Sequence, residues 1–381
     1  MEDINIIKPE KNQRNQIIDA MKGILIILVV LGHTYNNFTY NFIYLFHVGL
    51  FFVLSGYCFS QKYTDSFSSL WELFMKRIKS LWIPYVFYNF VFLLLQNIWL
   101  KVGFLTSDET YFSYEPFLKD GYCLPITIID AVKAIIKSFF FMNSRPFAGG
   151  LWFLGGLFYV TFMYVSIQFI MRKLKIEKFH IVISILFLLT GWLIEKVGLI
   201  EKLLILKQVA IILISEVLFC IGTYVRQYIH LQNFKALTYC AGFFLFLVII
   251  FILSAFGSVS VASVHIVNPL FYLTAIMSGG GLLICLLRLL NSINANSIIS
   301  FFSFIGNKTI PILALHPICF KLITVIQWKV YGGDKIVLSM YPVWKNSIPW
   351  AMAYLVIGVT IPLLLVFPFS KTKFGKSVLK C

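Results

Sequence analysis

The segment KGILIILVVLGH, Lys22–His33, decides how this chain folds. An aliphatic run bounded by glycines separates a lysine from a histidine, and runs of this kind recur along all 381 residues. Apolar residues make up 59% of the sequence and 39 residues are phenylalanine, far outside the range of a soluble domain. Because an apolar helix of about 20 residues crosses a bilayer, the pattern predicts an all-α polytopic membrane protein.

The apolar runs predict about ten transmembrane helices. Short loops that carry lysine and arginine alternate with less basic ones, which places both termini in the cytoplasm by the positive-inside rule. The predicted spans are 17–37, 42–61, 80–100, 151–171, 180–198, 207–226, 236–256, 268–290, 304–328 and 347–368.

The whole chain, 1–381, is predicted to form one membrane domain. A cytoplasmic tail covers 1–16, a basic cytoplasmic tail covers 369–381, and one long external loop covers 101–150. The N-terminal region lacks a cleavage-site pattern, so the first apolar run is expected to be retained as a helix. Within the external loop, IIDAVKAIIKSFFFMN is too short and too charged to span, which favours a helix lying along the membrane surface.

The formal net charge of +16 does not indicate nucleic-acid binding, because the cations lie mostly in short loops where they report orientation. The seven cysteines are scattered, without a CxxC pair or metal-ligand spacing, and are expected to be small core residues. No metal is therefore expected from the sequence.

Lys22 and His33 lie on one face of the first span. Eleven positions correspond to three turns plus roughly 20°, and to about 16 Å along the axis. Ionisable residues inside a span are costly and are by default candidates for function. A stripe carrying a cation at one end and an imidazole at the other crosses most of the bilayer.

Other interpretations of these residues remain open. Lys22 could extend to the inner headgroups with Asp19 as its partner, and a single intramembrane histidine is often a packing residue. His47, however, lies at a similar depth on the next span, and two imidazoles at one depth favour a functional role for at least one. Other polar residues lie within or near the spans: Glu216 and His316 could line the same cavity or satisfy a neighbouring helix, whereas His180, His230 and His265 are expected to be solvated.

Three N-terminal motifs carry a family resemblance: IIDAMKGILIILVVLGHT, IYLFHVGLFFVLSGY and KRIKSLWIPYVFYN. The chain resembles acyltransferase family 3 and is most similar to its fucose O-acetylase-like sugar acetyltransferase branch. The segments LWFLGGLFYV and FIGNKTIPILALHPI match in the expected order, so the resemblance covers nearly the whole chain. The family motif of a basic residue, ten residues and a histidine falls on Lys22 and His33, with lysine where many members have arginine.

The resemblance implies transfer of an acyl group, usually acetyl from acetyl-CoA, to a carbohydrate hydroxyl beyond the membrane. His33 and His47 are then the candidate catalytic residues, with His33 as general base and His47 orienting it, or the reverse. Cytoplasmic cations are expected to bind the phosphates of the acyl-CoA: Lys22, Arg14, Lys76 and Arg77. The expected partners are acyl-CoA, a lipid-linked or polymeric glycan of the cell envelope, and membrane lipid, in a bacterial cytoplasmic membrane.

Two other classes of function fit a polytopic chain. A glycan-precursor transporter or flippase also places ionisable groups in the membrane, but the sequence shows no internal repeat and Pro317 has no counterpart in the first half. A non-catalytic membrane subunit of a polysaccharide-export complex would leave both histidines without a role.

Overall fold

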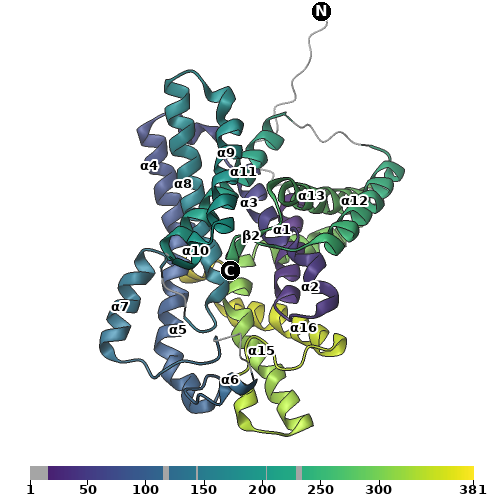
Figure 1. Ribbon diagram of the computed structural model, residues 1–381. Coiled ribbons are helices and arrows are strands. Elements are labelled where there is room, and N and C mark those ends of the chain that lie inside the picture. The colour runs from purple at the N-terminus through teal and green to yellow at the C-terminus, as the bar shows by residue number, and fades with distance from the viewer. Residues whose placement is uncertain (1–15, 115–119, 143–144, 203, 229–233) are drawn as a thin grey trace, which may run out of the picture.

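The computed structural model describes residues 16–114, 120–142, 145–202, 204–228 and 234–381, and this part of the chain is almost entirely helical (Figure 1). One two-residue antiparallel pair of strands, β1 (Val259–Ser260) and β2 (His265–Ile266), is the only sheet in these residues. The α-helices there are α1 (Gln16–Gly32), α2 (Asn37–Tyr44), α3 (His47–Tyr57), α4 (Phe67–Arg77), α5 (Ile83–Val102), α6 (Tyr111–Tyr114), α7 (Ile128–Phe139), α8 (Trp152–Lys173), α9 (His180–Lys196), α10 (Leu199–Lys202), α11 (Leu204–Tyr228), α12 (Ala236–Phe256), α13 (Pro269–Ser292), α14 (Asn296–Gly306), α15 (Thr309–Tyr331) and α16 (Ile348–Val366).

In these same residues, nine helical segments are long and apolar enough to cross a membrane. They coincide with nine of the ten predicted spans, and the tenth corresponds to α1, which has 17 residues. The prediction of an all-α polytopic membrane protein is confirmed.

The first two spans differ from the prediction in where they end. α1 stops at Gly32 and the chain turns through Tyr35, whose φ is 48°. The second span is broken between α2 and α3, and His47 is the first residue of α3. Both candidate histidines therefore lie beside a helix break, where side chains can face a cavity.

The loop predicted between the second and third spans is partly helical. α4 continues through a π-helical turn, Ile78–Trp82, into α5, so Phe67–Val102 forms one 36-residue helical segment. Lys76 and Arg77 thus lie on the last turn of α4, not in a loop as the sequence suggested. A helix fixes their side chains relative to the bundle far better than a loop does.

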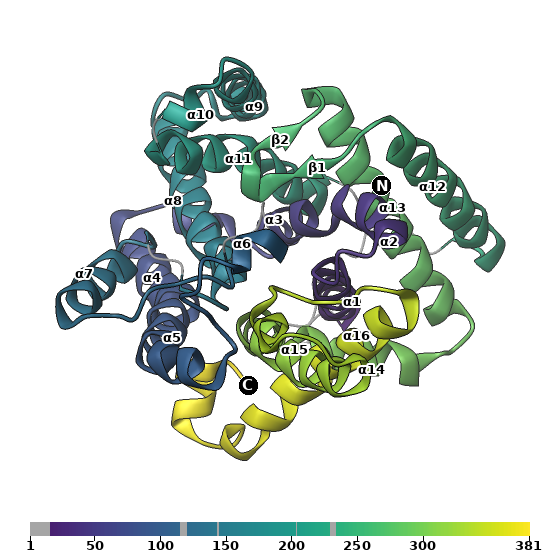
Figure 2. The same cartoon turned by 60° about the horizontal axis from the view of Figure 1, so that its bottom comes forward.

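α1 occupies the interior, surrounded by α14, α15 and α16 on one side and by α13, α3 and α2 on the other (Figure 2). The short α14 was not predicted and crosses α1 in close contact. A β-carbon on Gly23 would lie 1.9 Å from the carbonyl oxygen of Phe302, and one on Gly306 would lie 1.8 Å from that of Asp19. Only glycine allows the two backbones to approach this closely.

α3 crosses α11 in the same way. A β-carbon on Gly56 would lie 2.0 Å from the carbonyl oxygen of Phe219, and one on Gly222 would lie 2.0 Å from that of Val53. The two glycine crossings fix α1, which carries Lys22 and ends one residue before His33, and α3, which begins at His47.

α7, predicted as a helix lying along the membrane surface, packs along α5. Asn97 near the end of α5 exchanges hydrogen bonds with the backbone of Ile126, whereas Trp82 before α5 donates to the carbonyl oxygen of Phe139. α7 therefore runs antiparallel beside α5 (Figure 1), along the axis of a spanning helix. Its outer face is apolar, with Ile128, Val132 and Ile136 exposed, the amphipathic pattern that is typical of a helix in contact with a membrane surface.

Candidate functional site

One cavity of about 550 Å³ brings together both candidate histidines and two of the four basic residues that the sequence singled out. Lys22, Arg77, His33 and His47 all line this space, which we call the main cavity. α1 places Lys22 and His33 about 16 Å apart along its axis, since His33 still donates its backbone N–H to the carbonyl oxygen of Val29. Apolar side chains line the wall as well, among them Ile26, Val29, Phe51, Phe153, Leu157 and Leu313.

A second hollow of about 210 Å³, the cation chamber, meets the main cavity at Lys22, Ser55 and Arg77. Lys76 and Tyr63 complete its polar wall, and the ammonium of Lys76 lies 3.4 Å from the hydroxyl of Tyr63. Three of the four predicted phosphate-binding residues therefore gather at one end of the site. The fourth, Arg14, lies outside the described residues.

Lys22 and Arg77 differ in whether their polar atoms have partners within the protein. Lys22 forms an ion pair of 3.3 Å with Asp19, as one interpretation of the sequence suggested, but its side chain remains 28% exposed. The Nε of Arg77 is buried and has no hydrogen-bond partner among the described residues. A buried guanidinium with unused donor capacity suits an anionic ligand, because its donors match phosphate geometry.

At the other end, His33 is paired with a histidine from α15. Nδ1 of His33 lies 2.9 Å from the carbonyl oxygen of Val29 and 3.2 Å from Nε2 of His316. A carbonyl oxygen can only accept, so Nδ1 carries the hydrogen and Nε2 of His33 keeps its lone pair. No described residue makes a hydrogen bond to that Nε2.

The ring of His316 is oriented in the same way, by a hydrogen bond to a backbone carbonyl oxygen. Its Nδ1 lies 2.9 Å from the carbonyl oxygen of Ile312, which leaves Nε2 to accept from His33. The sequence raised His316 as a possible cavity residue but gave the orienting role to His47. The structure brings His316, from 283 positions away, into contact with His33 instead.

His47 lies in the same cavity next to a row of tyrosines. Its Nδ1 is 2.8 Å from the carbonyl oxygen of Ile43, and its ring meets that of Tyr44 edge-on, with centroids 4.9 Å apart. The ring centroids of Tyr44 and Tyr40 are 4.0 Å apart, and those of Tyr40 and Tyr35 are 5.7 Å apart. All three tyrosines line the main cavity, so its histidine end is rimmed by aromatic faces.

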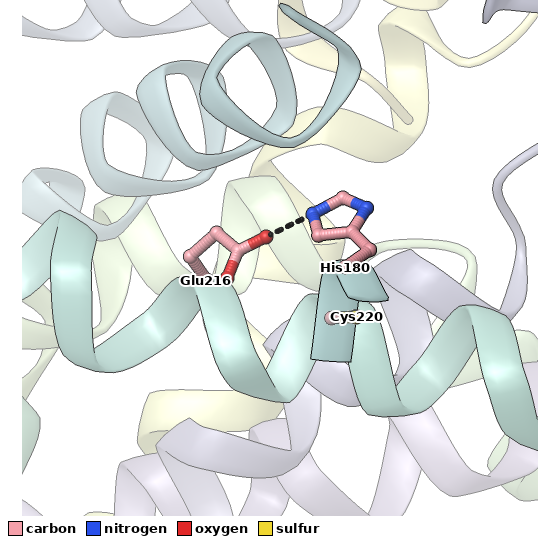
Figure 3. Close-up of side chains that lie close together, drawn as sticks. All are labelled: His180, Glu216 and Cys220. Carbon is pink, nitrogen blue, oxygen red and sulfur yellow. Dashed lines mark hydrogen bonds and ion pairs between the residues drawn. The ribbon is translucent and has the colours of Figure 1, made fainter. Parts of the chain in front are cut away.

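The remaining ionisable residues fall elsewhere. His265 is exposed, as predicted, and His230 lies outside the described residues. His180 was expected to be solvated, but it is buried and contacts Glu216 (Figure 3). The sequence did not indicate that His180 is buried, because it lies at the start of a predicted span. Burial there depends on how α8 and α11 pack over the end of α9.

Neither the curated proteins nor the solved structures include a match to this chain. A family model does match: the acyltransferase domain Acyl_transf_3 aligns with residues 15–367, nearly the full length. The matched region contains Lys22 and His33, both ends of the main cavity and eight of the nine long apolar segments found in the described residues. The ninth, Ile348–Phe369, lies within it except for its last two residues. The chain therefore belongs to acyltransferase family 3 and is a membrane O-acyltransferase.

Proposed function

We propose that this protein transfers an acetyl group from acetyl-CoA to a hydroxyl of a cell-envelope or exopolysaccharide sugar, in the cytoplasmic membrane of a bacterium. One observation carries the proposal: the main cavity meets the cation chamber at one end and holds a histidine with a free Nε2 at the other. Acyl-CoA has the matching shape, with phosphates at one end and the thioester at the end of a long arm.

The cation chamber is the proposed phosphate site. Lys22, Lys76 and Arg77 supply the charge, and the buried Nε of Arg77 has no hydrogen-bond partner among the described residues. The narrow, modestly polar pantetheine arm then follows α1 along the apolar wall, and the thioester reaches the level of His33. Because the donor is cytoplasmic, this arrangement requires the Lys22 end to face the cytoplasm.

His33 is the proposed general base. As the acceptor hydroxyl oxygen attacks the thioester carbonyl carbon, its proton passes to Nε2 of His33. The tetrahedral intermediate then collapses with cleavage of the C–S bond, and the departing thiolate takes the proton from the imidazolium. His316 acts as a positioning residue, because its Nε2 shares the hydrogen on Nδ1 of His33 with the carbonyl oxygen of Val29. The two acceptors together hold the ring in the tautomer that the base needs.

The tyrosine rim is the proposed acceptor site. Tyr35, Tyr40 and Tyr44 offer ring faces and hydroxyls next to His47, the mixture of apolar surface and a few polar groups that small-molecule sites use. A sugar ring lying against these faces would present a hydroxyl towards His33. His47 then contacts the sugar or the intermediate, which keeps it among the catalytic residues.

Reconstituted protein tests the proposal. Full-length protein in liposomes is supplied with acetyl-CoA labelled on the acetyl group and with lipid-linked and polymeric glycans, and ester-bound label is measured by mass spectrometry. Label is expected in one glycan class with the unmodified protein and not with the His33→Ala variant. Movement of glycan across the bilayer without acyl transfer would instead support the transporter hypothesis, and neither activity would favour the export-subunit hypothesis.

A further inference from the structure

A second buried cluster lies apart from the main cavity, between α9 and α11. His180 opens α9, and Glu216 and Cys220 lie four residues apart on α11, on one face of that helix (Figure 3). The side chains of His180 and Glu216 are 1% and 0% exposed, and Cys220 is also fully buried. One potential ligand atom from each of the three residues lies within 4.8 Å of the other two.

The contacts of His180 call for a positive charge at this position. Its Nδ1 makes a very short contact with Oε1 of Gln168, and its Nε2 lies 3.0 Å from Oε1 of Glu216. Both partners are acceptors, whereas a neutral imidazole has a single N–H. With the hydrogen on Nδ1, the lone pair of Nε2 faces a carboxylate oxygen, and either a second proton or a metal ion bound at Nε2 makes that approach favourable. A histidine held through one nitrogen by an oxygen while the other faces a cation is the usual arrangement at protein metal sites.

Glu216 provides the second, independent indication of a ligand. Its Oε2 is buried and has no hydrogen-bond partner among the described residues. A buried carboxylate oxygen that has no partner is costly in an apolar interior, even though Oε1 of the same group contacts His180. A divalent ion bound by one carboxylate, one thiolate and one neutral imidazole has no net charge, so all three groups could remain buried together.

We propose that His180, Glu216 and Cys220 bind a zinc ion that ties α9 to α11. Zinc prefers nitrogen, sulfur and carboxylate ligands in tetrahedral geometry, at about 2.0–2.3 Å from the metal. Ligand atoms in such a site lie roughly 3.4 Å apart, so a pair of ligand atoms at the 4.8 Å limit needs to close by about 1.4 Å. The site lies outside the proposed path of the acyl donor, so we assign the ion a structural role. By tying α9 to α11 it would also support α3, which crosses α11 at Gly56 and Gly222.

Metal analysis of the full-length protein, purified without a polyhistidine tag, tests this directly. About one zinc ion per chain is expected in the unmodified protein. Cys220→Ala and His180→Gln should reduce zinc to the background level, whereas Cys285→Ala, which removes a partly exposed cysteine of α13, should leave it unchanged.

Cobalt provides a readout that does not depend on activity or on metal content alone. Protein loaded with cobalt should show a thiolate-to-cobalt charge-transfer band that is absent in the Cys220→Ser variant. Addition of zinc to chelator-treated protein should raise the midpoint of thermal unfolding, and this shift should disappear in Cys220→Ala. The proposal would be overturned if the unmodified protein held only background zinc and if added zinc did not raise its midpoint of thermal unfolding. That result would favour a proton shared between His180 and Glu216. Retention of a full equivalent of zinc by Cys220→Ala would overturn it as well.

Discussion

His33, His47 and His316 each direct Nδ1 at the carbonyl oxygen four residues earlier in the chain. The helix backbone therefore selects the same tautomer in all three rings and leaves every Nε2 as an acceptor. Only His33 has a second imidazole against its Nδ1, with ring centroids 4.9 Å apart. This difference supports the proposal that His33 is the base and His316 its positioning residue.

Replacement of His33 by glutamine should abolish acyl transfer while the protein still inserts and binds acyl-CoA. Glutamine keeps hydrogen-bonding capacity but cannot take a proton near neutral pH, and loss of a general base costs about 10²–10⁴-fold in rate. Initial rates with labelled acetyl-CoA measure the effect, and His265→Gln, at an exposed histidine, serves as the matched control. Normal turnover by His33→Gln with an inactive His47→Gln would exchange the two roles.

At position 316, leucine and glutamine should behave differently. Leucine removes the acceptor that faces Nδ1 of His33, so kcat should fall roughly 10-fold or more, with little change in KM for acetyl-CoA, as expected when a hydrogen bond to a charged group is lost. Glutamine can still accept and should restore part of kcat. Equal kcat values for His316→Leu and His316→Gln would argue for a packing role only.

Lys22→Ala should act mainly through KM for the acyl donor, because its proposed role is to hold phosphates far from the reacting carbon. Loss of one charged contact corresponds to roughly a 10-fold rise in KM. Lys22→Arg should retain much of the activity, since the positive charge is kept. Lys137→Ala, at an exposed lysine of α7, is the control, and unchanged kinetics of Lys22→Ala would exclude the phosphate role.

At the scale of elements, the reciprocal glycine pairs decide how deeply helices interlock. Gly23 with Gly306, and Gly56 with Gly222, allow backbone atoms of crossing helices to touch. In lipid, helices associate largely through this kind of close packing, because burial of apolar surface contributes little between them. Each crossing fixes one of the helices that line the main cavity.

Gly222→Ala should therefore lower stability by about 1–3 kcal/mol, the usual cost of overpacking. A β-carbon there would lie 2.0 Å from the carbonyl oxygen of Val53, so α3 and α11 must separate. Gly156→Ala is the matched control, because its β-carbon would meet its nearest neighbours at 3.6 Å, an ordinary contact. Thermal unfolding in detergent compares the two variants, and equal midpoints would show that the crossing relaxes without cost.

At the scale of the whole molecule, the proposed direction of transfer requires the Lys22 end of the main cavity to face the cytoplasm. The alternation of basic loops makes the same prediction, with both termini inside. Exposed residues at opposite ends of the bundle offer a test: Ser107 lies between α5 and α6, and Lys175 lies between α8 and α9.

Cysteine introduced at Ser107 should react with an impermeant thiol reagent added to intact cells, whereas cysteine introduced at Lys175 should react only after lysis. The unmodified chain, with its seven free cysteines, measures the background. Labelling of Lys175→Cys from outside would reverse the orientation and exclude Lys22 as a contact for cytoplasmic acyl-CoA.

Sequence alone determined the features that depend on local composition and on lipid as the solvent. Uninterrupted apolar runs must form helices, because every backbone polar group has to be satisfied within the segment. Helix geometry then placed Lys22 and His33 on one face of the predicted first span at a known separation, because the turn and the rise per residue are fixed. The family resemblance placed on the motifs is confirmed by the match over residues 15–367.

Only the tertiary structure decided which helices meet. The contact between His33 and His316, the gathering of Lys22, Lys76 and Arg77, and the burial of His180 against Glu216 all join segments far apart in the chain. These contacts depend on which glycines allow which backbones to cross, and composition is nearly uniform along the apolar runs, so it carries little information about partners. The break before His47, the short α14 and the course of α7 beside α5 have the same origin. Each is stabilised by packing against a neighbour that no local pattern specifies.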